Sequence, residues 1–145
     1  MEPYPYRYKV EATGAANGVT RISSTGLPTL ETAAPRQYGG PGNQWSPECL
    51  LVGAAADCFV LTFRAVATAS AFAWRDLRCE VEGVLDRIEH VTRFTQLSLA
   101  VRLVIPSGGD AERAQRLLEK AEKTCLVTNS LSAAVNMTCV VESEP

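Results

Sequence analysis

Two stretches in the second half of the chain alternate apolar and polar residues and predict β-strands. Within Leu77–Leu85 every second residue is apolar or small, and charged residues fill most of the positions between. The same alternation returns in Gln96–Ile105. A period of two is that of a strand with one buried face. Because only a short turn around residues 89–92 separates the two stretches, we expect a β-hairpin.

A long apolar run, Leu50–Phe63, predicts a helix. Ser46, Pro47 and Glu48 precede it, and they suit the N-cap, the first helical position and the first turn respectively. The run is apolar nearly all the way round a helix, which is typical of a buried element. We therefore expect a helix from Ser46 to about Phe72, at the centre of the fold.

A second helix is expected after the turn formed by residues 106–109. Asp110 suits its N-cap, and the helix should run to about Lys123, with Cys125 just beyond its end. Its apolar stripe comprises Ala114, Leu117, Leu118 and Ala121.

The remaining segments carry weaker patterns. The first third of the chain favours short strands, and the loop QYGGPGNQW follows them. The expected elements are strands within residues 6–12, 19–23 and 27–33, a helical turn at 129–134 and a closing strand at 137–141.

Composition narrows the class of protein. With 145 residues the chain fits one domain over residues 1–145. The formal net charge is −2 and the basic residues are scattered, which is not the pattern of a nucleic-acid binder. No signal sequence is recognisable at the N-terminus, and Leu50–Phe63 is short for a bilayer span and contains Asp57. We expect a soluble, cytoplasmic protein whose partner is a small molecule or another copy of the chain.

The five cysteines have irregular spacing and no C-x-x-C, which argues against a disulfide framework and against a zinc ribbon. Cys79 and Cys139 fall on the apolar faces of expected strands, where a thiol packs as a small hydrophobe. Cys49 and Cys58 lie on opposite sides of one helix, so they cannot form a disulfide within it. Cys58 lies inside the long apolar run, whereas Cys125 ends a charged, helix-like stretch. Two cysteines in such contrasting settings are a candidate redox pair, and the interpretation that both are unreactive stays open.

A nucleophilic Cys58 would need help to ionise. An ordinary thiol, with a pKa of about 8.5, is only a few per cent thiolate at neutral pH, and apolar burial lowers that fraction. Cys58 also lies mid-helix, where the helix dipole offers little. We expect a cation from elsewhere: Arg36 in the segment AAPRQYGG, or Arg21. Glu48 lies about 15 Å along the helix axis from Cys58, so it would serve this site from a second subunit or a folded-back loop, or else only stabilise its own helix start.

The segment YGGPGNQWSPECLLVGAAADCF, followed some sixty residues later by AEKTC, resembles the OsmC/Ohr family of organic hydroperoxide resistance and osmotically inducible proteins. The resemblance covers nearly the whole chain. It implies an α+β fold in which a long central helix packs against an antiparallel β-sheet, in an intertwined homodimer with active sites at the interface.

The resemblance also implies a thiol peroxidase that reduces organic hydroperoxides to alcohols and protects against oxidative stress. Cys58 would be the peroxidatic thiolate, Cys125 the resolving thiol, and Glu48 the acid that positions the arginine. Neither metal, haem nor flavin is needed. Small dithiols or lipoyl groups would be the reductants, and the apolar neighbours Phe59 and Leu61 suit a greasy peroxide.

Two departures from the family pattern stand out. ATGAANG places Ala16 where Ohr-type members have an arginine, so Arg36, which resembles the arginine of OsmC-type members, is the preferred candidate and Arg21 the second. Leu126 follows the resolving cysteine where the family commonly has proline, which is expected to loosen the local turn.

A different class of function stays open. A dimer of the same fold that binds an apolar ligand between its subunits, with idle cysteines, would explain the missing Ohr-type arginine. A hydrolase triad is disfavoured because the one histidine, His90, lies in an expected hairpin turn. The glycines in the loop do not form a phosphate loop, since the characteristic lysine is missing.

Overall fold

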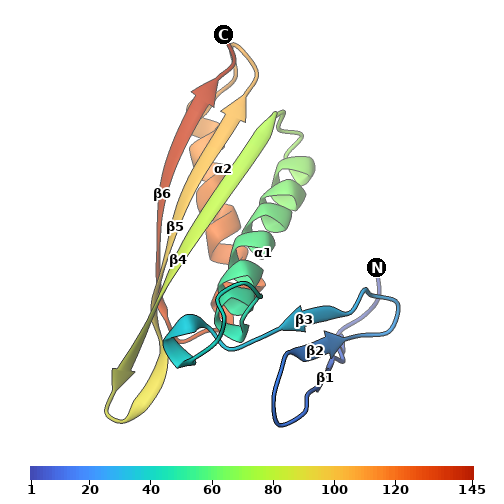
Figure 1. Cartoon of the computed structure of the whole chain (residues 1–145). Coiled ribbons are helices and arrows are strands. Elements are labelled where there is room, and N and C mark those ends of the chain that lie inside the picture. Colours follow the sequence, from blue (N-terminus) through green and yellow to red (C-terminus); the bar gives the residue numbers. More distant parts are fainter. The chain divides into compact units, whose positions relative to one another are not determined.

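The computed structural model describes all residues, Met1–Pro145 (Figure 1). Its internal contacts divide the chain into two compact units, Met1–Leu50 and Leu51–Pro145. Helix α1, Pro47–Ala69, begins in the first unit and continues in the second. The expectation of one domain over residues 1–145 stays a prediction.

The first unit contains a small antiparallel sheet in the order β1-β2-β3. Its strands are β1 (Glu11–Thr13), β2 (Thr20–Ser23) and β3 (Leu30–Thr32), followed by the short 3-10 helix η1 (Arg36–Tyr38). The expected second and third strands are confirmed with shorter bounds. The expected strand over residues 6–12 is wrong for residues 6–10, because β2 ends at Ser23, which already pairs with Glu11.

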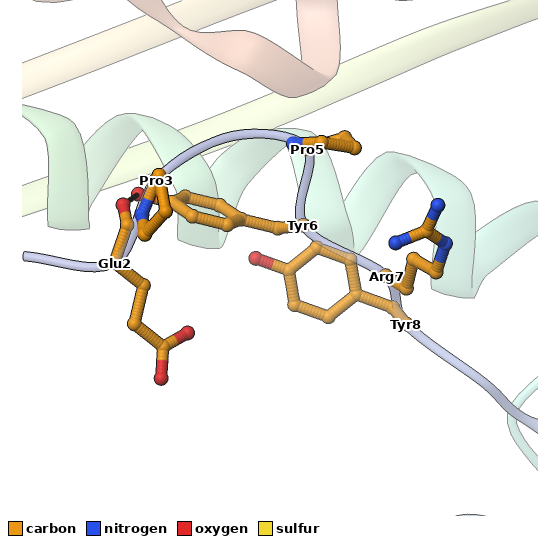
Figure 2. Close-up of a pocket in the computed structure, with 6 residues that line it drawn as sticks. All are labelled: Glu2, Pro3, Pro5, Tyr6, Arg7 and Tyr8. Atoms are coloured by element: carbon orange, nitrogen blue, oxygen red, sulfur yellow. Dashed lines mark hydrogen bonds between the residues drawn. The ribbon is translucent and has the colours of Figure 1, made fainter.

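The first eight residues form a local aromatic turn instead of a strand. Figure 2 shows the side chains of this turn around a shallow hollow. The rings of Tyr4 and Tyr6 lie 4.4 Å apart between centroids, and the Tyr6 hydroxyl donates to the Glu2 carbonyl at 2.6 Å. These contacts are all within the turn. The residues that line the hollow are Glu2, Pro3, Pro5, Tyr6, Arg7 and Tyr8.

The start of α1 is confirmed, because the Ser46 hydroxyl accepts a hydrogen bond from the Cys49 backbone N–H at 3.1 Å. Within the second unit α1 buries one stripe, with a residue at every fourth position. The expectation that the whole circumference is buried is wrong for the single chain, where Leu61 is 49% exposed. The buried stripe comprises Ala55, Phe59, Phe63 and Ala67.

By length and composition alone α1 is apolar enough to cross a membrane, a test that the core helix of a soluble protein also passes.

The second unit contains a three-stranded sheet in the order β4-β5-β6 (Figure 1). Its strands are β4 (Asp76–Ile88), β5 (Val91–Ile105) and β6 (Ala134–Ser143). The expected hairpin is confirmed as the antiparallel pair β4 and β5. The expectation of a wholly antiparallel sheet is wrong for β6, which runs parallel to β5. The helical segment between these two strands carries the chain back to the end where β5 began, and a parallel pair requires such a crossover.

Two helices form the crossover from β5 to β6. α2 (Ala111–Thr124) is capped as expected, since the Asp110 carboxylate accepts from the Arg113 N–H at 2.9 Å. α3 (Leu126–Asn129) follows almost at once. The helical turn expected at 129–134 therefore lies earlier, and the Ser130 hydroxyl, which donates to the Leu126 carbonyl at 2.7 Å, closes it there.

One hydrophobic cluster joins the helices to the sheet of the second unit. The expected stripe of α2 is confirmed, because all four of its residues are buried. Gly83 of β4 allows α1 to approach closely, since a Cβ there would lie 2.7 Å from a methyl carbon of Val52. The sheet contributes Leu97, Leu99, Val101, Leu103 and Ile105 from β5.

The hairpin turn gives a first prediction. Ile88 pairs with Val91, and the two turn residues Glu89 and His90 have φ of 50° and 68°. Both lie in the left-handed region, which an L-residue adopts at a cost and glycine adopts freely. Replacing His90 by glycine should therefore raise the free energy of unfolding by about 0.5–1 kcal/mol, measured by urea denaturation. An unchanged or lower free energy of unfolding would contradict the view that His90 is strained in this turn.

Candidate thiol site

The sulfur of Cys58 lies among hydrogen-bond donors in the second unit. Cys58 is half-buried on α1, and its Sγ lies 3.7 Å from the hydroxyl oxygen of Thr62, one helical turn further on. The thiol of Cys125 and the backbone of Val127 and Leu126 also lie near enough to Cys58 to lower its pKa. The structure thus brings together the two cysteines that the sequence pairs as a candidate.

Cys125 occupies the junction between two helices. It is the C-cap of α2 and the N-cap of α3, with an extended backbone at ψ of 110°. The N–H groups of the first turn of a helix have no carbonyl partner inside that helix. In α3 these include the N–H groups of Leu126 and Val127, and the backbone of both residues lowers the pKa of Cys58. The junction therefore supplies Cys58 with two backbone donors as well as the neighbouring thiol.

The two thiols differ in acidity. Burial alone would raise the pKa of Cys58, but the hydrogen bonds from Val127, Cys125, Thr62 and Leu126 outweigh it and bring that pKa below its ordinary value. Burial raises the pKa of Cys125, and its contact with Cys58 acts in the same direction against the hydrogen bonds of Thr128. Of the two thiols, Cys58 is therefore the one that ionises first as the pH rises.

The other three cysteines do not share this setting. Burial, with Cys125 and Cys139 nearby, raises the pKa of Cys79 to about 12, and burial also raises the pKa of Cys139. Both pack against the core as expected. They flank Val101 across β5, two strand spacings or about 9.6 Å apart, which is beyond the Cα distance of a disulfide. Cys49 is exposed.

The residues expected to assist Cys58 lie in the first unit. Arg36 belongs to η1, and its side chain covers Gly42 at the place that a side chain there would fill. Glu48 stands in the first turn of α1, and its Oε1 is buried without a hydrogen-bond partner. Arg36 and Glu48 form no ion pair. Arg21 pairs instead with Glu31 at 3.2 Å on the exposed face of the small sheet.

Sequence reasoning missed the donors that lower the Cys58 pKa. Thr62 was readable in principle, because a residue four positions after Cys58 lies on the same helix face. The two α3 amides were not, since the sequence places that helical turn too late. Leu126 begins α3, and it has a backbone N–H that proline lacks. The two apolar neighbours of Cys58 that were expected to suit a peroxide differ in exposure. Phe59 is fully buried in the core, whereas Leu61 is 49% exposed.

No group of three or more His, Cys, Asp or Glu side chains is arranged to hold a metal ion. The reactive groups that lie together at this site are the thiols of Cys58 and Cys125. A lowered pKa on a half-buried cysteine, beside a second cysteine that keeps its proton, suits nucleophilic attack followed by disulfide formation.

Comparison with known proteins gives consistent matches along the chain. The sequence profile described as OsmC-like protein matches residues 40–140. The uncharacterized protein YmaD of Bacillus subtilis (strain 168) is 28% identical over 140 residues, which cover 94% of this chain and 93% of that protein.

Two solved structures illustrate the likeness in fold. An OsmC-like protein of unknown function from Vibrio cholerae superposes with a TM-score of 0.84 at 15% identity, over 94% of this chain and 100% of that one. An organic hydroperoxide resistance protein OsmC from Legionella pneumophila superposes with a TM-score of 0.73 at 28% identity, over 97% and 99% of the two chains.

Proposed function

Because the chain belongs to the OsmC-like family, which includes an organic hydroperoxide resistance protein of similar sequence, we propose that it is a cysteine-based thiol peroxidase that reduces organic hydroperoxides to alcohols. One observation carries the proposal above all. Cys58 and Cys125 lie near enough to act on each other's pKa, and the pKa of Cys58 is lowered while that of Cys125 is raised. Such a pair separates the roles of nucleophile and resolving thiol.

The proposed reaction has three steps. The Cys58 thiolate attacks the terminal oxygen of the hydroperoxide, the O–O bond breaks, and the alkoxide leaves and takes a proton from water to become the alcohol. Cys58 is now a sulfenic acid. The Cys125 sulfur attacks the Cys58 sulfur, a disulfide forms, and the hydroxyl leaves as water with the Cys125 proton. A small dithiol or a lipoylated protein then reduces the disulfide by exchange.

Arg36 and Glu48 complete the proposed site. A buried carboxylate oxygen without a partner, as at Glu48, is costly and calls for a cation or donor. Arg36 makes no ion pair that would hold it elsewhere, whereas Arg21 is engaged with Glu31. We therefore assign Arg36 as the arginine that Glu48 positions, to polarise the bound peroxide. Their proposed role is to favour the thiolate and to stabilise charge in the transition state.

The proposed enzyme is a single OsmC/Ohr-like domain over residues 1–145 that acts as an intertwined homodimer in the cytoplasm. The exposed side of α1 supports the homodimer. Leu61 is 49% exposed there, and the small residues Ala54 and Ala65 are exposed on the same helix. A second copy of the chain would cover this apolar surface, which is otherwise unusual on the long helix of a single chain.

A second candidate has one observation in its favour. Neither arginine is paired with Glu48, so the arrangement that would polarise a peroxide is incomplete in the single chain. A dimer that binds or senses an apolar small molecule between its subunits, without turnover, needs no such arrangement. The two candidates make opposite predictions for peroxide consumption.

The test uses the full, reduced chain with excess dihydrolipoamide. The peroxidase proposal expects faster consumption of cumene hydroperoxide than of hydrogen peroxide. In the absence of reductant, one equivalent of cumene hydroperoxide should remove two hydrogens per chain, and peptide mass spectrometry should locate a Cys58–Cys125 disulfide. Consumption of neither peroxide would reject the proposal and leave the binding dimer. A disulfide that joins other cysteines would reject the site assignment.

A further inference from the structure

The hydroxyl of Thr62 is directed at a sulfur rather than at the backbone. Helical Thr and Ser side chains commonly donate to the carbonyl four residues earlier. Thr124 does so to Lys120 at 2.8 Å, and Ser130 does so to Leu126 at 2.7 Å. The half-buried Thr62 instead has its one hydrogen bond, at 3.7 Å, with the sulfur four residues earlier, that of Cys58.

The direction of this hydrogen bond depends on the state of Cys58. A protonated thiol is a weak donor and a weak acceptor, so either atom can donate. A thiolate can only accept, and a hydrogen bond to an ionised group is about twice as strong as one between neutral groups. The contact therefore stabilises the thiolate more than the thiol.

We propose that Thr62 is a further residue of the thiol site, whose hydroxyl donates to the Cys58 thiolate and holds it ionised and oriented for attack. The proposal rests on the proposed function only in that the thiolate is taken to attack a hydroperoxide. The contact is with the reacting sulfur itself, on a rigid helix, so Thr62 acts directly. In the disulfide the sulfur is a poor acceptor, and the Thr62 hydroxyl is released.

Charged groups of the second unit do not replace this donor. On α1, Asp57 and Arg64 are both exposed. Burial raises the pKa of Cys58, and the groups that lower it are Val127, Cys125, Thr62 and Leu126, none of them a charged side chain. Three of these four donors come from the junction of α2 and α3, and Thr62 is the one donor on the helix of Cys58 itself.

The test is the rate of Cys58 alkylation by iodoacetamide between pH 5 and 10, followed by peptide mass spectrometry in a Cys49→Ser background. Because only the thiolate reacts, the pH at half-maximal rate gives the Cys58 pKa. Thr62→Val, which keeps the shape, should shift this pH upward and slow the reaction at pH 7 about three- to tenfold. Thr62→Ser should restore most of the rate. Thr68→Val, an exposed threonine of the same helix, is the matched control.

Two outcomes would overturn the proposal: an unchanged pH profile in Thr62→Val, or an equal shift in Thr68→Val. A melting curve for each variant separates a lost fold from a lost donor, and Thr62→Ser keeps the comparison valid where valine does not fold. Alkylation requires no peroxide. An inactive protein that still shows the Thr62 shift would therefore reject the peroxidase proposal and retain the role of Thr62.

Discussion

Replacing Cys58 by serine is expected to reduce the turnover of cumene hydroperoxide at least about a thousand-fold. A serine hydroxyl is barely ionised at neutral pH, and it is far less nucleophilic than a thiolate of lowered pKa. Serine fits the space of cysteine on a half-buried helix position, so the fold should persist. The measurement is steady-state peroxide consumption with dihydrolipoamide, alongside circular dichroism to confirm the helix content.

Replacing Cys125 by serine should give a different failure. Cys58 keeps two backbone donors and Thr62, so the first attack on peroxide still occurs. Without the neighbouring thiol the sulfenic acid has no partner in the chain, and it accumulates or oxidises further. We expect about one equivalent of peroxide to be consumed per chain before turnover stops, and mass spectrometry should find Cys58 as a sulfenic acid that a dimedone probe traps.

Cys139→Ser is the matched control for both variants. This cysteine packs beside the core on β6, and burial raises its pKa, so its loss should leave turnover within about twofold of the wild type. Sustained turnover in the Cys58 variant would place the nucleophile at another cysteine. Multiple turnovers in the Cys125 variant would mean that the external reductant reaches the sulfenic acid directly.

Truncating Phe63 to alanine should have the largest effect on stability. Its side chain is fully buried on α1 and meets Trp74 edge-to-face, with ring centroids 5.5 Å apart. The substitution removes apolar area, leaves a cavity between helix and sheet and deletes an aromatic pair. We expect a loss of about 3–5 kcal/mol in the free energy of unfolding, seen as a melting temperature lower by about 10–20 °C.

Calorimetry at one protein concentration measures this change, because dimerisation would make the melting temperature depend on concentration. Leu61→Ala is the control on the same helix. Leu61 is 49% exposed in the single chain, so a loss nearly as large as that of Phe63→Ala would show that a second copy buries it. If Phe63→Ala lowered the free energy of unfolding only slightly, the result would contradict the burial of Phe63 in the core.

The helices and the hairpin followed from the sequence because local patterns determine them. The cap at Ser46, the cap at Asp110 and the period of two on either side of Glu89 and His90 all act within a few residues. The direction of β6 did not follow. Its own alternation is the same in a parallel and an antiparallel pair, and only the helical crossover before it decides between them.

The thiol site was predictable to the same extent. Cys58 and Cys125 were identified as a candidate pair by their contrasting settings, and a resemblance to a family added their roles. The donors that tune Cys58 were missed because Leu126 and Val127 act through backbone N–H groups, which any residue but proline supplies. The sequence predicts a cation, Arg36 or Arg21, beside Cys58, and in the single chain neutral groups already lower the Cys58 pKa.

The position of Cys125 at the joint between α2 and α3 has a mechanical consequence. A disulfide to Cys58 would tie the middle of α1 to that joint and close a loop from residue 58 to residue 125. In the chain-entropy model a covalent loop of that length disfavours the unfolded state by about 4 kcal/mol. Each catalytic cycle would then alternate between a disulfide-bonded and a more easily unfolded reduced form. Resistance to proteolysis would therefore report what fraction of the protein in a cell is oxidised.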